Sequence, residues 1–254
     1  MNAVDPIRFV ELFHLLFLVQ LGRRLDKSAF VVKGGCNLRF FHRSIRFSED
    51  LDLDAGEVTT QVLQDRVRAV LTSRPFADIL EARGIRVEHL TEHKQTDTTQ
   101  RWKMGLRAGG VTVRLPTKIE FSRRGLDEGV VFGSVDPNVV RLHQLPPLMV
   151  SHYEEAAAFQ QKVGALAGRR ETQARDVFDV HHLLATGGVS GVRTLLDPDV
   201  AARARANAMS VDFGMFKGQV LAYLAPEEQA RYDSPSVWDT VVLEVVDALG
   251  AGGS

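Results

Sequence analysis

Hydrophobic and polar positions follow two different patterns along the chain, with a change near residue 146. Near the N-terminus, Phe9, Phe13 and Leu16 keep helical spacing while further leucines cover the other faces, which is typical of a buried helix. The segments that follow alternate apolar and polar residues, as strands with one buried face do. This alternation predicts five strands, over residues 29–33, 49–54, 85–90, 101–107 and 111–122.

Helical spacing predicts most of the remaining elements. In the first half, helices are predicted over residues 36–42 and 59–74, and Pro75 is expected to end the second of them. Ala108-Gly109-Gly110 suits a hairpin turn between two of the strands. After Pro146-Pro147 the pattern is mostly helical, with helices predicted over residues 153–167, 173–185, 198–208, 215–224 and 236–249. The chain is therefore predicted to contain an α/β domain, residues 1–145, and a helical domain, residues 146–254.

Composition places the chain among ordinary soluble globular proteins. It has 254 residues, 44% of them hydrophobic and 25% charged, which is enough for a sizeable core. The apolar run at residues 9–21 is interrupted by polar side chains and is too short to span a bilayer. Cys36 is the single cysteine, so an intrachain disulfide is impossible. These features predict a cytoplasmic protein without a membrane partner.

The charge balance says little about partners. The formal net charge is −1, whereas a nucleic-acid-binding protein usually has a basic face. A local basic patch on a neutral protein remains compatible with the sequence, although paired arginines are more often solvated surface. Such pairs occur at Arg23–Arg24, Arg123–Arg124 and Arg169–Arg170.

Chemistry is concentrated between Val32 and Asp54. A strand-like run is followed by a glycine pair, a short helix-like segment and then two aspartates on an alternating strand. Glycine lets backbone N–H groups approach phosphates closely. Asp50 and Asp52 leave one strand face, roughly 6–7 Å apart, so both could hold divalent metal ions. Oxygen-only ligands favour a hard cation, Mg²⁺ first and Mn²⁺ as the alternative.

A two-metal site usually needs a third carboxylate from a neighbouring strand. Glu120 is the candidate, because it lies on the polar side of the alternating strand at residues 111–122, with Lys118 beside it. The alternative is that Lys118, Glu120 and Ser122 form a solvent-facing edge. The sequence pattern alone leaves both interpretations open.

These motifs resemble a known family. The letters GGCNLRFF…IRFSEDLDLD resemble the signature of the DNA polymerase beta nucleotidyltransferase superfamily, a glycine pair followed by Asp-hydrophobic-Asp. The segment Arg46–Asp52 more narrowly resembles AbiEii-type toxins of bacterial toxin–antitoxin systems, a group that includes the mycobacterial MenT toxins. Lys118–Ser122 resembles the second motif of that family, and Lys162 with Arg175–Asp179 resembles its Lys…Arg-Asp-x-x-Asp motif.

The resemblance implies a nucleotidyltransferase-like mixed sheet flanked by helices, followed by a helical domain that completes a nucleotide cleft. It implies Mg²⁺-dependent transfer of a nucleoside monophosphate from an NTP to RNA, most simply the 3′ end of tRNA, so that translation stops. It also implies a cognate antitoxin, and we expect a monomer. Metal ligands would be Asp50, Asp52 and Glu120, and Glu120 could instead activate the attacking hydroxyl. Nucleotide contacts would come from Gly34, Gly35, Cys36, Arg46, Ser48, Lys118 and Lys162, with Asp176 as a further catalytic residue.

Three positions keep alternatives open. The family usually has Thr or Ser where this chain has Cys36, and a thiol is a weak donor, so phosphate binding would rely on backbone N–H groups. Lys162 shares a helix face with Phe159 and Leu166, and could extend to solvent or contact the triphosphate. Asp176 could position a substrate hydroxyl, the nucleotide or Lys162, or could belong to a surface charge cluster.

Two other functions are compatible with the same motifs. The acceptor could be a protein hydroxyl or a small molecule such as an aminoglycoside, which the near-neutral charge slightly favours and the family resemblance disfavours. The chain could also be a nucleotide-binding module without turnover. A full acidic set argues against that module, because binding alone does not require three carboxylates.

Overall fold

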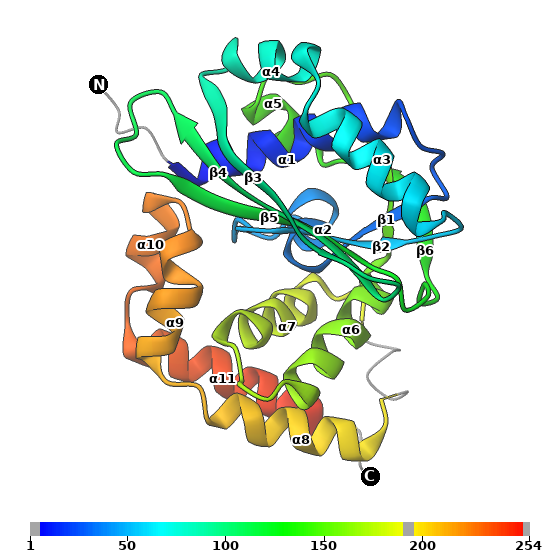
Figure 1. Ribbon diagram of the computed structural model, residues 1–254. Helices are drawn as coiled ribbons and strands as arrows, with labels where there is room; N and C mark the ends of the chain where they lie inside the picture. Colours follow the sequence, from blue (N-terminus) through cyan, green and yellow to red (C-terminus); the bar gives the residue numbers. More distant parts are fainter. Residues whose placement is uncertain (1–5, 190–195, 251–254) are drawn as a thin grey trace. The chain divides into compact units, whose positions relative to one another are not determined.

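The computed structural model describes residues 6–189 and 196–250 (Figure 1). The chain forms two compact units. Unit 1 contains Met1–Phe41 and Phe47–Tyr153, and unit 2 contains His42–Arg46 and Glu154–Ser254. A five-residue segment from the N-terminal half of the sequence therefore belongs to the C-terminal unit. This exchange places Arg46, from the AbiEii-like motif, in unit 2.

Unit 1 is built on a seven-stranded sheet with the strand order β3-β4-β5-β2-β1-β7-β6. Its strands are β1 Phe30–Lys33, β2 Leu51–Ala55, β3 Ile85–Gln95, β4 Thr99–Ala108, β5 Leu115–Ser122, β6 Val130–Ser134 and β7 Met149–Tyr153. The pairs β2–β5 and β1–β7 are parallel, and the other pairs are antiparallel. The predicted mixed sheet is confirmed.

Helices cover one face of this sheet, as Figure 1 shows for α1, α3 and α4. The helices of unit 1 are α1 Pro6–Gly22, α2 Gly34–Phe41, α3 Thr60–Leu71, α4 Arg74–Glu81 and α5 Pro137–Leu142. Fully buried side chains of α1 and of the central strands form one core, among them Phe13, Phe17, Trp102, Ile119 and Phe121. Burial of aromatic and aliphatic surface on this scale is the main stabilising term of the unit.

The alternation of buried and partly buried residues along β5 explains why its charged side chains lie outside the core. Thr117, Ile119 and Phe121 are buried, whereas Lys118 and Glu120 between them are only partly buried. Successive strand residues point to opposite faces, so the core side chains face the helices and the two charged side chains face the other way. The face of the sheet that carries Lys118 and Glu120 is called the functional face below.

Several elements differ from the sequence prediction. Pro75 does not end a helical region: Ser73 caps a new helix, α4, and Pro75 occupies its first turn, where a missing N–H costs nothing. The predicted strand 111–122 begins only at Leu115, and Val113 is exposed. The alternation of apolar and polar residues continues into the turn after β4, and for this reason the sequence predicted a strand that begins too early. Strands β6 and β7 and helices α4, α5 and α10 were not predicted, because they are short and lack a clear period.

Unit 2 is helical, as predicted. It contains α6 Glu155–Gly168, α7 Ala174–Thr186, α8 Pro198–Met209, α9 Phe213–Gln219, the 3₁₀ helix η2 Leu221–Tyr223, α10 Pro226–Tyr232 and α11 Pro235–Gly250. Phe216 and Trp238 stack with ring centroids 4.5 Å apart in its core. The predicted domain boundary follows residue 145, whereas β7 pairs with β1 and so extends unit 1 to Tyr153. None of the helices in the described ranges has the length and apolarity needed to cross a bilayer.

Gly56, directly after β2, gives a test of the packing at this end of the sheet. A Cβ at this position would collide with the backbone carbonyl oxygen of Ser28, and backbone cannot easily move aside. We expect Gly56→Ala to lower the free energy of unfolding by about 1–3 kcal/mol. Urea denaturation measures this loss.

The matched control is Gly22→Ala, because a Cβ there would meet nothing within 4 Å. We expect this change to be neutral or slightly stabilising. Equal stability of the two variants would contradict the close packing at Gly56.

Candidate active site

Three carboxylates converge on one ammonium group on the functional face. Strands β2 and β5 are parallel neighbours with Asp52 opposite Glu120. The Lys118 Nζ lies 3.1 Å from Asp50 Oδ2, 3.5 Å from Asp52 Oδ1 and 3.8 Å from Glu120 Oε2. The backbone N–H of Lys118 also donates to Asp50 Oδ1 at 3.1 Å. Residues that are about 70 positions apart in sequence thus form one compact charged cluster.

Partial burial and the closely spaced negative charges make this cluster favour a bound cation. Burial raises the pKa of Asp50 above its usual range, although the ammonium of Lys118 opposes that rise. Burial alone would lower the pKa of Lys118, but the charges of Asp52, Asp50 and Glu120 raise it, so the lysine stays protonated. A second source of positive charge is Arg101 on β4, whose Nε lies 2.5 Å from Glu120 Oε2.

The oxygen-only donors of the three carboxylates suit a hard divalent cation, although Lys118 already supplies a positive charge among them. In the described ranges, however, no three His, Cys, Asp or Glu side chains are grouped closely enough to enclose a metal ion. Glu120 is held by Arg101. Asp50 and Asp52 are therefore the stronger pair, while Glu120 would have to leave Arg101 to become a ligand.

The glycine pair lies directly against this acidic cluster. Gly34 has φ +64°, a left-handed conformation that glycine adopts without strain. A Cβ on Gly34 would come within 3.2 Å of Asp52 Oδ2, so a larger residue would crowd the carboxylate. Gly35 follows in the first turn of α2, where backbone N–H groups lack helical partners. The local sequence thus places free donors beside the acids.

Cys36 and Ser48 both act on the backbone of Asp50. The Ser48 hydroxyl donates to the Asp50 carbonyl at 2.8 Å, and Cys36 Sγ donates to the same oxygen at 3.3 Å. Cys36 is 1% exposed, so its thiol points inward. The thiol is therefore engaged with the Asp50 backbone, and a phosphate contact from the Cys36 N–H stays a prediction. Both side chains hold Asp50 in place.

A buried histidine extends this network behind the strand. His14 of α1 is fully buried, and its Nε2 lies 2.8 Å from Thr117 Oγ1, which donates to the Glu49 carbonyl at 2.7 Å. Its Nδ1 lies 3.7 Å from Cys36 Sγ. Burial lowers the pKa of His14 to about 4, although the charges of Glu11 and Asp52 oppose that shift. Neutral His14 thus links α1, α2, β5 and, through Thr117, the segment directly before β2.

Unit 2 holds a second ionic cluster, formed by residues that the sequence analysis connected only through a motif. The Lys162 Nζ lies 3.2 Å from Asp176 Oδ1 and 2.7 Å from Asp179 Oδ2. Lys162 is 8% exposed and both aspartates are fully buried. Lys162 therefore does not extend to solvent. Of the alternatives for Asp176, the structure shows contact with Lys162, and also with Arg169 Nε at 2.5 Å.

Arg46 completes this second cluster. Its Nε and Nη2 lie 3.0 and 2.8 Å from the two oxygens of Asp179, a bidentate pair. Burial alone would raise the pKa of Asp179, but the charges and hydrogen bonds of Arg46 and Lys162 hold it well below its usual range. Arg46 is 5% exposed, so this contact defines its position. A nucleotide contact of Arg46 stays a prediction.

Comparison with known proteins identifies the family of the chain. The family model described as "Nucleotidyl transferase AbiEii toxin, Type IV TA system" matches residues 16–237. The chain belongs to the AbiEii family. It is a toxin-type nucleotidyltransferase of a type IV toxin–antitoxin system, as the motifs predicted. No curated protein sequence matches the chain.

Solved structures share the fold of this AbiEii protein. MenT4, a nucleotidyltransferase toxin from Mycobacterium tuberculosis, is similar with a TM-score of 0.58 and 19% identity, over 97% of this chain and 92% of that one. A putative nucleotidyltransferase from Helicobacter pylori gives 0.55 and 18%, over 94% and 92%. The JHP933 protein from H. pylori gives 0.54 and 18%, over 95% and 90%. The predicted nucleotidyltransferase-like fold is confirmed.

Sequence reasoning did not select three residues that belong to the charged clusters of the AbiEii protein or to the hydrogen-bond network beside them. Arg101 was read only as part of a strand, but the antiparallel register places it opposite Glu120. His14 appeared as an interruption of an apolar helix, and a polar residue on a buried helix is the signal that could have identified it. Asp179 was noted beside Asp176 but not selected, although a helix spacing of three places both on one face.

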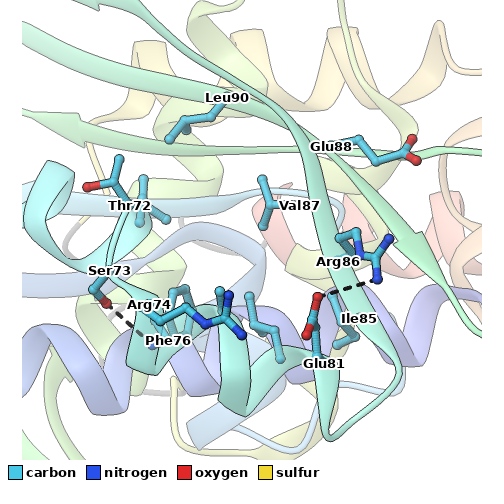
Figure 2. Close-up of a pocket in the computed structure, with 13 residues that line it drawn as sticks. Thr72, Ser73, Arg74, Phe76, Glu81, Ile85, Arg86, Val87, Glu88 and Leu90 are labelled. Carbon is cyan, nitrogen blue, oxygen red and sulfur yellow. Dashed lines mark hydrogen bonds and ion pairs between the residues drawn. The ribbon is translucent and has the colours of Figure 1, made fainter.

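One pocket of unit 1 lies away from these residues. It has a volume of about 360 Å³ and lies between α4 and β3, with Phe76, Leu80 and Val87 in its lining. Figure 2 shows the Arg86–Glu81 ion pair at its edge. None of the predicted site residues lines it.

Buried His14 predicts a pH dependence of stability. Its pKa is about 4 in the folded protein, against an ordinary value of 6.5, so the unfolded chain binds the proton first. Its contribution is present above pH 6.5 and is lost as the pH falls toward 4. Between pH 7 and pH 5 we expect wild type to lose about 2 kcal/mol more than His14→Gln. Urea unfolding at both pH values measures the difference.

The control is His93→Gln, which changes an exposed histidine of β3. This variant should lose as much stability as wild type over the same pH range. If His14→Gln also followed wild type, the histidine would titrate normally and the buried network would be wrong.

Proposed function

We propose that this AbiEii protein transfers a nucleoside monophosphate from an NTP to the 3′ end of tRNA, in a reaction that requires Mg²⁺ and stops translation. The observation that carries the chemistry is the convergence of Asp50, Asp52 and Glu120 around one positive charge. Family membership supports nucleotidyl transfer, and the RNA acceptor rests on the motif resemblance.

Asp50 and Asp52 would hold the divalent cation, because they share a strand face beside Gly34 and both already face an ammonium. When bound, the metal would neutralise charge on the phosphates and lower the pKa of the attacking hydroxyl. Glu120 retains its two candidate roles, as a further ligand or as the group that accepts the hydroxyl proton. The ion pair with Arg101 holds Glu120 beside the cluster, and Glu120 would have to leave that pair to bind a metal ion.

The remaining predicted residues would bind the triphosphate. Backbone N–H groups at Gly34, Gly35 and Cys36, in the first turn of α2, would donate to phosphate oxygens, as at other helix N-termini. The ammonium group of Lys118, which contacts Asp50, would also attract a phosphate of a nucleotide bound beside the acids. Lys162 would contribute a second positive charge, held in one orientation by Asp176. Ser48 would act through the Asp50 backbone.

In the proposed reaction, the acceptor hydroxyl displaces pyrophosphate from the NTP. The acceptor hydroxyl oxygen forms a bond to the α-phosphorus of the NTP while the bond to the bridging oxygen breaks. Pyrophosphate leaves, and the hydroxyl proton passes to a nearby carboxylate or to solvent. We expect the nucleotide to lie in a cleft completed by the helical unit, which stays a prediction. A cognate antitoxin and a monomeric state are part of the same proposal.

Asp50→Asn tests the chemistry, because it keeps the shape of the side chain and removes its charge. We expect pyrophosphate release in the presence of NTP, Mg²⁺ and tRNA to fall by about 10²–10³-fold, together with loss of growth inhibition. A coupled pyrophosphate assay measures the rate, and a chelator should abolish wild-type activity. The control is Asp65→Asn, an exposed α3 residue, which should keep wild-type rates. Full toxicity of a folded Asp50→Asn protein would overturn the mechanism.

The acceptor needs a separate experiment. The full chain is incubated with labelled NTPs, Mg²⁺ and cell extract, and the product is divided between RNase and protease. We expect RNase alone to release the label, and purified tRNA to replace the extract. Release by protease, or label in a small molecule, would favour the other acceptors. No pyrophosphate release with any acceptor would favour a binding module without turnover.

A further inference from the structure

Three cross-strand pairs in the sheet of unit 1 join one cation to another. Arg86 lies opposite Arg107 and Lys94 lies opposite Arg101 across β3 and β4. Lys103 on β4 also lies opposite Lys118 on β5. Like charges placed directly opposite each other destabilise a sheet by tenths of a kcal/mol each. The arrangement is therefore unfavourable for the protein alone, unless negative groups offset it.

Acidic side chains offset four of these cations. Glu88 lies at a register shift of β3, and its carboxylate contacts Arg107 at 2.6 Å. Arg101 is paired with Glu120, and Lys118 with the catalytic aspartates. Arg86 turns toward α4 and pairs with Glu81 at 3.4 Å, as Figure 2 shows. Each of these cations has a carboxylate within 4 Å.

Lys94 and Lys103 have no such compensation. Both side chains are exposed, and in residues 6–189 and 196–250 neither makes a hydrogen bond or an ion pair. They share the functional face, because Lys94 pairs with Arg101, which itself faces Glu120, and Lys103 pairs with Lys118. Arg114 adds to this surface, because its side chain lies across Gly105 on the same face, and Arg107 and Arg114 share the single carboxylate of Glu88. The surface therefore has positive charge in excess.

This surface is continuous with the acidic cluster. Arg101 touches Glu120, and Lys103 and Arg107 follow on β4 at intervals of two and four residues. At the rise of a strand, the row from Arg101 to Arg107 extends about 20 Å from the cluster. Neighbouring strands add a parallel row about 5 Å away. A chain of negative charges that ends at the acidic cluster would meet several cations along its length.

We propose that Lys94 and Lys103, with Arg107 and Arg114, form a docking surface for the phosphate backbone of the RNA acceptor. The proposal rests on the RNA acceptor of the proposed function and adds where the body of that RNA binds. Charge complementarity favours a polyanion, since a small anion would need only one of these cations. Backbone contacts position a nucleic acid without reading its sequence, so this surface sets affinity and not the choice of RNA.

The test is the salt dependence of RNA binding by Lys94→Gln/Lys103→Gln in the full chain, with purified bulk tRNA as the probe. Each phosphate contact that is lost makes the slope of log K against log salt shallower by about 0.7–0.9. We expect the double variant to bind tRNA more weakly, with a slope shallower by about 1.4–1.8. Its KM for tRNA should rise, while its affinity for NTP stays at the wild-type value.

Two control proteins isolate the effect. Arg24→Gln/Arg66→Gln removes two exposed cations, one directly after α1 and one on α3, and should keep the wild-type slope. Lys94→Arg/Lys103→Arg keeps the charges and should keep tRNA affinity. If the lysine-to-glutamine variant behaves like the first control, this docking surface is wrong while the proposed function stands. If wild type neither binds nor labels RNA, the RNA acceptor is wrong and the surface with it.

Discussion

Mutual repulsion of carboxylates is the constraint on which this structure depends. The parallel pairing of β2 and β5 brings Asp50, Asp52 and Glu120 together, and negative groups at this spacing cannot all stay charged without a cation. Lys118 supplies that cation from within the same strand pair. The lysine therefore serves as an internal counterion. A metal ion entering the site would compete with a charge already present, which favours its arrival together with a triphosphate.

The rest of unit 1 holds this cluster in register. One side of the sheet is committed to the core, so the catalytic strands cannot slip by one residue without burying charge. Behind them, Ser48, Cys36 and His14 anchor the start of β2 through hydrogen bonds to main-chain or side-chain atoms. In unit 2, Arg46, Lys162 and two aspartates form a buried ionic group whose members depend on one another. Removing one partner would leave an uncompensated buried charge.

The sequence predicted the fold class and the acidic residues because both follow from local patterns. Strand alternation placed Asp50 and Asp52 on one face, and Glu120 on the polar side of its strand. It could not predict that Arg101 would hold Glu120, or that Lys118 would lie between the acids, because these contacts depend on the register of neighbouring strands. Partners such as Asp179 for Arg46 are more than 100 residues apart in sequence. Val113 shows the opposite failure, in which a regular pattern continues past the end of the strand.

Cys36 has a consequence for the chemical durability of the protein. The thiol is 1% exposed, and burial raises its pKa well above the ordinary value. Oxidants and electrophiles react with accessible thiolates, and this sulfur offers neither the access nor the charge. The single cysteine of the chain follows the glycine pair directly in sequence, yet its sulfur is shielded from the oxidation and alkylation reactions that accessible thiolates undergo.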